Sequence, residues 1–138
     1  MKRLFLLAAM LLAFSGAHAG QEAIMVGFSN GWVGSEWRTQ MIEDARQVAE
    51  EYKKMGWVSD VVVQSTDVTV EDQIDQIRNL MARGCKIIVV NPNDAKAFNP
   101  VVAEAKRRGV LIVGTDTELS SKDALNVGID QQVFALTS

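Results

Sequence analysis

Short apolar runs and amphipathic segments alternate along the chain from residue 23 onward. Apolar runs of strand length occupy residues 23–28, 58–64, 86–90, 110–114 and 125–129. Between the first four runs, apolar positions recur at three- and four-residue steps, the period of a helix with one buried face. Strands that are apolar without alternation, joined by helices, indicate a parallel sheet with helices on both faces. The pattern therefore predicts an α/β fold, a doubly wound parallel sheet with right-handed crossovers.

The first two predicted helices carry start and stop signals. The first spans residues 36–55 and ends at Gly56, which readily takes the left-handed conformation that closes a helix. Thr69 is placed to cap the second helix, with Asp72 three residues on, and Gly84 follows its last turn. We expect the apolar face of the first helix to be buried; it consists of Trp37, Met41, Ile42, Ala45, Val48, Ala49, Tyr52 and Met55.

The third helix and the end of the chain are less regular. The third helix ends near Arg108, and Asn99 and Pro100 indicate a restart with Asn as the cap and Pro as the first helical residue. Asp130 is placed to cap a further amphipathic helix over residues 131–138. We expect the sequence to stop inside this element, so that the predicted sheet is truncated.

The amino-terminal segment has the three parts of a secretory signal. Lys2 and Arg3 precede an apolar run over residues 4–14, and a small-residue pair with an intervening histidine follows, ending at Ala19. A membrane anchor is the alternative, but this run falls short of the roughly 20 residues that span a bilayer. The segment predicts export with cleavage between Ala19 and Gly20, leaving residues 20–138 as the mature chain.

Charge and rare residues exclude several classes of function. Fourteen Lys and Arg oppose seventeen Asp and Glu, a net charge of −3 that gives no basic surface for nucleic acid. Cys85 is the single cysteine, so a disulfide framework is excluded, and it begins an apolar run where we expect it to be buried and inert. His18 is the single histidine and falls in the predicted signal.

The motifs of common enzyme classes are absent. The glycines after the first strand have the wrong spacing for a dinucleotide loop, and neither a P-loop nor a GxSxG elbow occurs. Asp67, Asp116 and Glu118 are an alternative carboxylate site for a metal, but no lysine follows a matching strand. The sequence thus predicts no enzyme, no cofactor and no metal.

Polar segments follow four of the predicted strands, at residues 29–38, 65–67, 91–94 and 115–118. In open α/β sheets, ligands bind beyond the carboxyl ends of the strands, so these segments should meet at one site. They combine planar groups that both donate and accept with tryptophan rings, a set that suits the hydroxyls and C–H face of a sugar. The candidate ligand-binding residues are Ser29, Asn30, Trp32, Trp37, Arg38, Asp67, Asn91, Asp116 and Thr117.

Several of these residues also have a local interpretation. Ser29 and Asp67 are equally suited to turns or helix caps, and Asn91 to a turn before the proline that follows it. Trp37 falls on the apolar face of the first helix, where a place in the core is at least as well supported as a ligand platform. Trp32 lies in a loop between glycines, so a packing role in the core is less well supported for it than for Trp37.

Five segments, in this order behind a signal peptide, resemble the amino-terminal lobe of periplasmic sugar-binding proteins of ABC transporters. They are Val26-Gly27-Phe28-Ser29, Gln73-x-x-Gln76-Ile77, Ile87-Ile88-Val89-Val90-Asn91-Pro92, residues 110–116 and Val127-Gly128-Ile129-Asp130. The match is to the ribose-binding type, with two Rossmann-like lobes of the type I periplasmic binding protein fold. Residues 28–38, which carry the Trp37-Arg38 pair, are most similar to the galactofuranose-binding branch.

The resemblance implies transport. It places Ser29, Asn91 and Asp116 at positions that hydrogen-bond a monosaccharide, and Trp37 and Arg38 at the contacts of the galactofuranose branch. It also implies a periplasmic location and delivery of the sugar to an ABC permease in the inner membrane. The ribose branch has Arg where this chain has Thr117, and a pair of phenylalanines that this chain lacks, so ribose itself is disfavoured. The second lobe of the family, which completes the site, is missing from this sequence.

Two other classes share the predicted fold. A repressor effector domain is disfavoured because a signal peptide occupies the place of its DNA-binding headpiece. A sugar receptor that presents its ligand to a sensor kinase or chemoreceptor remains the alternative, because a presentation surface leaves no motif in the sequence.

Overall fold

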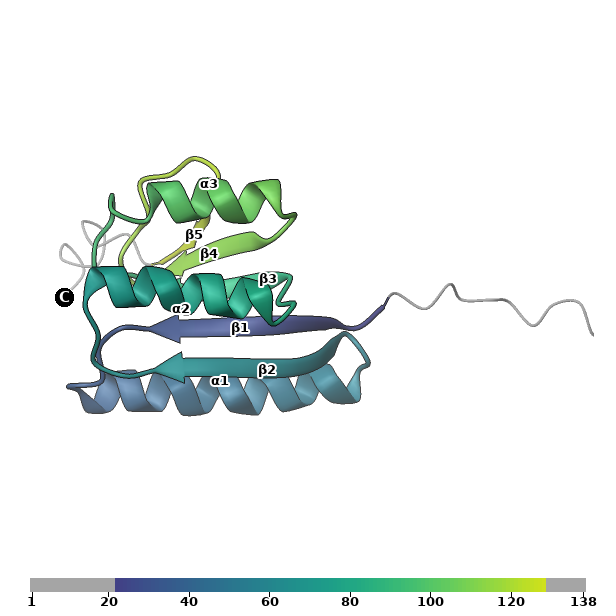
Figure 1. Cartoon of the computed structure of the whole chain (residues 1–138). Coiled ribbons are helices and arrows are strands. Elements are labelled where there is room, and N and C mark those ends of the chain that lie inside the picture. Colours follow the sequence, from purple (N-terminus) through teal and green to yellow (C-terminus); the bar gives the residue numbers. More distant parts are fainter. Residues whose placement is uncertain (1–21, 129–138) are drawn as a thin grey trace, which may run out of the picture.

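The computed structural model describes residues 22–128, and these form one parallel sheet with three helices (Figure 1). The strand order is β2-β1-β3-β4-β5, and every neighbouring pair is parallel. The predicted sheet is confirmed. The strands are β1 (Ile24–Asn30), β2 (Val58–Ser65), β3 (Ile87–Asn91), β4 (Leu111–Thr115) and β5 (Leu125–Val127).

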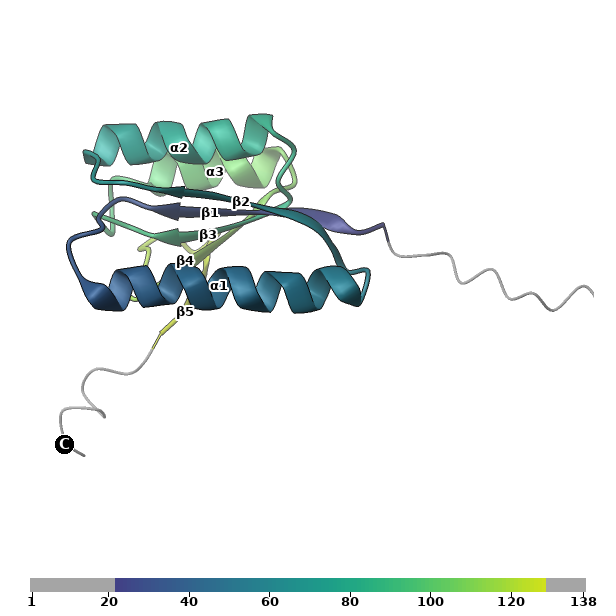
Figure 2. The ribbon, with the colours of Figure 1, turned by 90° about the horizontal axis from the view of Figure 1, so that it is seen from below.

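The helices lie on both faces of the sheet, as the doubly wound prediction requires. Figure 2 shows α2 (Val70–Ala82) and α3 (Asn99–Arg107) side by side on one face and α1 (Glu36–Lys54) on the other. The chain runs from β1 through α1 outward to β2, then through α2 across to β3, and onward through α3 to β4. The direction of winding therefore reverses between β1 and β3, which makes that pair the switch point of the sheet.

The expected helix ends are confirmed for α1 and α2 and for the end of α3 near Arg108, whereas the expected cap at the start of α3 is wrong. Gly56 follows α1 with a φ of 76°, and the Thr69 hydroxyl accepts a hydrogen bond from the backbone N–H of Asp72. Asn99 is not the cap of α3 but its first residue, and Phe98 takes the cap position without a side-chain hydrogen bond. The amide oxygen of Asn99 accepts from the Ser120 hydroxyl instead, which removes it from capping.

The core lies between the sheet and the α2–α3 layer. Its fully buried side chains come from α2, from α3 and its cap residue, and from the inward positions of β3 and β4, and they include Ile77, Leu80, Ile88, Val90, Phe98, Val101, Val102 and Ile112. Cys85 is buried as expected, and burial raises the pKa of its thiol. A buried thiol with a raised pKa is a poor nucleophile, which agrees with an inert role.

The face under α1 is more open than its sequence predicts. Val48 and Tyr52 are exposed although they belong to the apolar stripe of the helix, and Met55 is exposed as well. The helix packs mainly against β2, at one edge of the sheet. An apolar groove of about 570 Å³ remains between α1 and strands β1, β2 and β3, and Trp57 and Tyr52 border it. Helical periodicity identified the right face of the helix, but because α1 packs mainly on β2, part of that face stays uncovered.

Two predictions at the ends of the chain concern residues outside the described part. The signal segment over residues 1–19 and the helix expected to begin after Asp130 both lie there. The fifth strand, expected over residues 125–129, ends at Val127 in the structure. Among residues 22–128, no helix is both long and apolar enough to cross a membrane.

Candidate functional site

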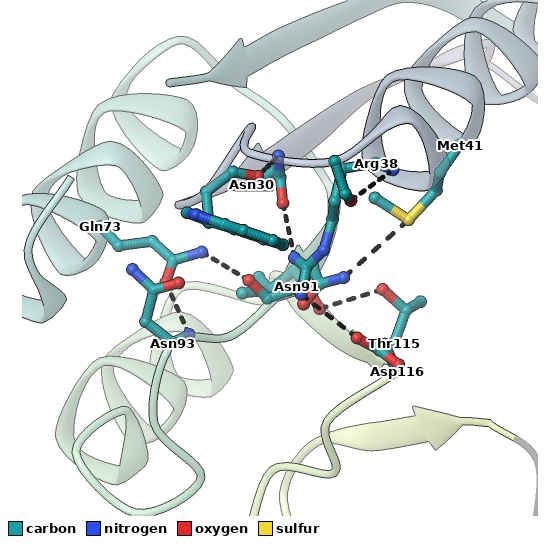
Figure 3. Close-up of polar contacts among 11 residues, drawn as sticks. Asn30, Arg38, Met41, Gln73, Asn91, Asn93, Thr115 and Asp116 are labelled. Carbon is teal, nitrogen blue, oxygen red and sulfur yellow. Dashed lines mark hydrogen bonds and ion pairs between the residues drawn. The ribbon is translucent and has the colours of Figure 1, made fainter. Parts of the chain in front are cut away.

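The polar residues gather at the switch point between β1 and β3, at the carboxyl edge of the sheet (Figure 3). Asn30 ends β1 and Asn91 ends β3, and the two residues are paired in register. Thr115 ends the next strand, β4. Side chains alternate between the two faces of a strand, and the parity of these three residues puts all of them on the α1 face. Three neighbouring strands therefore present polar side chains beside the first turn of α1.

Arg38 joins two of these strand ends. Its Nη1 donates to the Asn30 amide oxygen at 2.8 Å, and its Nη2 lies 3.2 Å from the Asp116 carboxylate (Figure 3). The Arg38 side chain is 14% exposed, so its guanidinium is held within the site rather than free in solvent. The sequence analysis predicts that Arg38 donates to a ligand, and in the structure Arg38 lies beside Asp116, a second predicted ligand contact.

Two indoles flank the guanidinium. The Cζ atom of Arg38 lies 5.5 Å from the centroid of the Trp32 ring and 5.6 Å from that of Trp37, within the range of cation–π attraction. Trp37 is 56% exposed, so a place in the core, the alternative suggested by helical periodicity, is wrong. Trp32 is also exposed, in the loop between β1 and α1. The site thus offers two open aromatic surfaces around a fixed cation.

Asp116 turns the chain out of β4 in an unusual conformation. Its φ of 65° lies in the left-handed region, which residues other than glycine seldom adopt and which Asp and Asn tolerate best. The turn leaves the carboxylate partly exposed and facing Arg38. Thr117 is exposed, and its backbone N–H closes the turn onto the carbonyl of Thr115. The structure brings Asp116 into the site, whereas no described side-chain contact does so for Thr117.

Within the polar edge, the hydrogen bonding of the Asn91 side chain is incomplete. Its side chain is fully buried, and its Nδ2 makes a long contact of 3.9 Å with the sulfur of Met41. Its Oδ1 has no hydrogen-bond partner among residues 22–128. An unpaired buried amide oxygen costs about 1–3 kcal/mol, which a ligand hydroxyl would recover by donating to it. A turn is not its role, because Asn91 is the last residue of the β3 ladder.

Two predicted contacts are engaged within the protein. Ser29 precedes Asn30 in β1 and therefore points to the opposite face, where its hydroxyl donates to Gln76 at 2.8 Å. Asp67 accepts from the backbone N–H of Val33 at 2.8 Å and so ties the β2–α2 loop to the loop that carries Trp32. Neither residue is a helix cap.

Two residues that shape this edge, Gln73 and Asn93, were not among the predicted ligand contacts. Gln73 is fully buried on α2 and hydrogen-bonds the backbone on both sides of Pro92. The side chain of Asn93 donates to the carbonyls of Gly31 and Val68. The sequence did carry a signal for Gln73, because it is a glutamine on the apolar face of an amphipathic helix. A buried amide must find hydrogen-bond partners, so such a residue is expected to bind a nearby polar group.

The site offers no net positive charge, because Arg38 is paired with Asp116 and the Asp67 carboxylate lies on a neighbouring loop. Arg38 and Asp116 form one ion pair, and the described residues contain no cluster of three or more metal-ligating side chains. An arrangement of neutral amides, one compensated ion pair and exposed indoles can bind an uncharged polyol, whereas it offers no net positive charge to hold an anion.

Comparison with known proteins agrees with this geometry. Residues 26–137 match the family model described as the periplasmic binding protein domain. The chain belongs to the periplasmic binding protein family. The resemblance expected from the sequence is thereby confirmed.

Individual members of the family show the same relationship. The D-xylose-binding periplasmic protein of Escherichia coli K12 is 33% identical over 63 residues, which are 46% of this chain and 19% of that protein. A solute-binding protein of an ABC transporter from Thermobispora bispora has a TM-score of 0.77 at 23% identity, over 83% of this chain and 36% of that one. A galactofuranose-binding protein has a TM-score of 0.67 at 25% identity, over 80% of this chain and 37% of that one. The chain thus spans little more than a third of the solved structures it resembles.

Proposed function

We propose that this protein is a periplasmic solute-binding component of a sugar ABC transporter. In this proposal, residues 20–138 form a sugar-binding lobe that is exported, cut after Ala19, and docks on a permease in the inner membrane. The observation that carries the proposal is the Arg38 guanidinium, fixed by Asn30 and Asp116 between two exposed indoles. Such a group is already oriented before a ligand arrives, so that binding costs little further ordering.

Each part of the site has a role toward a monosaccharide. Asp116 accepts from ligand hydroxyls, the remaining N–H groups of Arg38 donate to ligand oxygens, and the buried Oδ1 of Asn91 accepts from one more hydroxyl. The rings of Trp32 and Trp37 take the C–H face of the sugar. The E. coli relative that binds D-xylose and the structure that binds galactofuranose support a sugar of this size, in pyranose or furanose form.

A titration of the ¹⁵N-labelled protein with D-xylose, galactofuranose and D-glucuronate tests the ligand class. We expect one of the neutral sugars to give saturable chemical-shift changes and the anionic glucuronate to bind more weakly, because the site offers no net positive charge. Affinity in a cleft depends on burying most of the ligand, so a single lobe should bind in the millimolar range. Preference for glucuronate would contradict the proposed site.

Uptake of labelled sugar tests the transport role separately. Deletion of the chromosomal copy should abolish uptake of the neutral sugar that binds best, and the periplasmic protein should begin at Gly20 in an intact-mass measurement. A deletion strain with normal uptake that no longer responds to the sugar would favour the sensory role, in which the ligand is presented to a kinase or chemoreceptor.

A further inference from the structure

Gln73 is a polar residue in an apolar layer. It lies on the face of α2 that packs against the sheet, beside the core residue Ile77, and its side chain is fully buried. Burying a primary amide in such surroundings costs free energy unless its donor and acceptor are both used. An aliphatic residue would fill this place without that cost, so the hydrogen bonds of Gln73 need a reason beyond packing.

Both ends of the Gln73 amide bind the turn that follows β3. Its Nε2 donates to the carbonyl of Asn91 at 2.8 Å, and its Oε1 accepts from the backbone N–H of Asn93 at 3.0 Å (Figure 3). Pro92 stands between the two and has no N–H of its own. The side chain therefore hydrogen-bonds the backbone on both sides of Pro92, directly after the last residue of β3.

The side chain of Asn93 connects this turn to two further loops. Its Nδ2 donates to the carbonyl of Gly31 at 3.3 Å and to the carbonyl of Val68 at 3.0 Å. The first of these carbonyls belongs to the loop that carries Trp32, and the second to the loop that carries Asp67. The approach is close, because a Cβ on residue 31 would lie 2.8 Å from the Cγ of Asn93.

We propose that Gln73 is a positioning residue for the ligand site, acting through Asn93 on the loop that carries Trp32. Its hydrogen bonds hold the turn after β3 and so fix the position of Asn91. Through Asn93 they also fix the segment between β1 and the first turn of α1, which carries Trp32, Trp37 and Arg38. The proposal rests on the proposed function of that site, since it explains how a binding surface on three loops is kept in one arrangement.

The test compares Gln73→Met, Asn93→Ala, the double variant and Ile77→Val. Methionine matches the length of glutamine and removes both hydrogen bonds. Asn93 is exposed, so its truncation removes the downstream link with little effect on folding. Ile77→Val is the control, because it loosens the same helix in the core without touching any of the three loops. The indole N–H signals of Trp32 and Trp57 report the loop and the opposite edge of the sheet in one spectrum, with or without sugar.

We expect Gln73→Met and Asn93→Ala each to move the Trp32 indole signal and to leave the Trp57 signal in place. Each should weaken binding of the best neutral sugar at least tenfold, and the double variant should be no weaker than the worse single variant, because both changes break one chain of contacts. Ile77→Val should lower the melting temperature and retain the affinity.

The opposite pattern overturns the proposal. If Gln73→Met lowers only the melting temperature, with the Trp32 signal and the sugar affinity of the parent, Gln73 is a structural residue alone. If Gln73→Met does not fold, Asn93→Ala decides, and an unchanged Trp32 signal and affinity in that variant overturn the proposal. If the parent protein binds none of the sugars, the proposed function fails, and the Trp32 signal still decides whether Gln73 positions the loop.

Discussion

Asn30 and Asn91 stand opposite each other as the last paired residues of β1 and β3, and they differ in how fully their amides are used. The Asn30 amide donates to the Trp32 carbonyl and the Ser65 hydroxyl and accepts from Arg38. The Asn91 side-chain oxygen has no partner among the described residues. One asparagine thus builds the site, and the other leaves a buried acceptor unpaired beside it.

Asp116→Asn should weaken sugar binding while leaving the fold intact. Asparagine keeps the shape of the side chain and tolerates the left-handed conformation found at this position, so the change removes mainly the charge. A hydrogen bond to a charged group contributes about 1.5–3 kcal/mol, and we expect a loss of this size in the free energy of binding, measured by NMR titration. Asp123→Asn, which removes the charge of a carboxylate paired with Lys106 at 2.6 Å, is the matched control. Parent-like affinity in Asp116→Asn would show that the ligand does not contact this carboxylate.

Ser29→Ala should affect stability and spare sugar binding. Its hydroxyl donates to Gln76 on the α2 face, so its removal loses one partly buried hydrogen bond, at a cost of about 0.5–1.5 kcal/mol in the free energy of unfolding. Urea unfolding measures the loss, with Ser59→Ala on the exposed side of β2 as control. A variant with full stability and lost affinity would restore Ser29 to the ligand contacts that the sequence predicted.

Gly31→Ala should destabilise the protein through a clash with Asn93. The added Cβ would lie 2.8 Å from the Asn93 Cγ, and overpacking of this kind costs about 1–3 kcal/mol. Asn93→Ala removes the obstructing atoms, so the double variant should recover most of the stability that Gly31→Ala loses. Additive losses in a double-mutant cycle of urea unfolding would mean that the two residues do not meet.

Acid should weaken the turn after β3. The backbone N–H groups of Ala97 and Lys96 donate to the Asp94 carboxylate and hold its pKa below the ordinary value of 3.8. A carboxyl group with a lowered pKa in the folded state stabilises it fully above the ordinary value, and this contribution is lost as the pH falls through the lowered one. Between about pH 5 and pH 3, Asp94→Asn should therefore lose less free energy of unfolding than the parent protein does. Urea unfolding of both proteins at about pH 5, 4 and 3 measures these losses. Equal losses in the two proteins would contradict this role.

The sequence predicted the order of elements well because that order rests on local patterns. Apolar runs without alternation marked β1 and β3, and Thr69 and Gly56 marked helix ends that the structure confirms. The first strand continues through Ser29 and Asn30, beyond its apolar run, because both polar side chains find partners outside the strand. Composition alone does not show such partners.

The sequence predicted where the site lies in the fold better than it predicted which side chains contact one another there. Strand ends in a parallel sheet meet at one edge, which correctly brought Arg38 and Asp116 together. Which face each residue occupies depends on strand parity and register, so Ser29 was grouped with Asn30 although the two point to opposite faces. The role of Gln73 depends on contacts 18 and 20 residues along the chain, which helical periodicity does not report.

The most direct test of the central claim is a map of where a neutral sugar perturbs the ¹⁵N-labelled protein. We predict saturable shifts of the Trp32 and Trp37 indoles and of the backbone amides of Asn91 and Asp116, with the Trp57 indole unmoved at the opposite edge. Shifts confined to the apolar groove near Trp57, or no saturable shift with any neutral sugar, would contradict a sugar site at the carboxyl edge of the sheet.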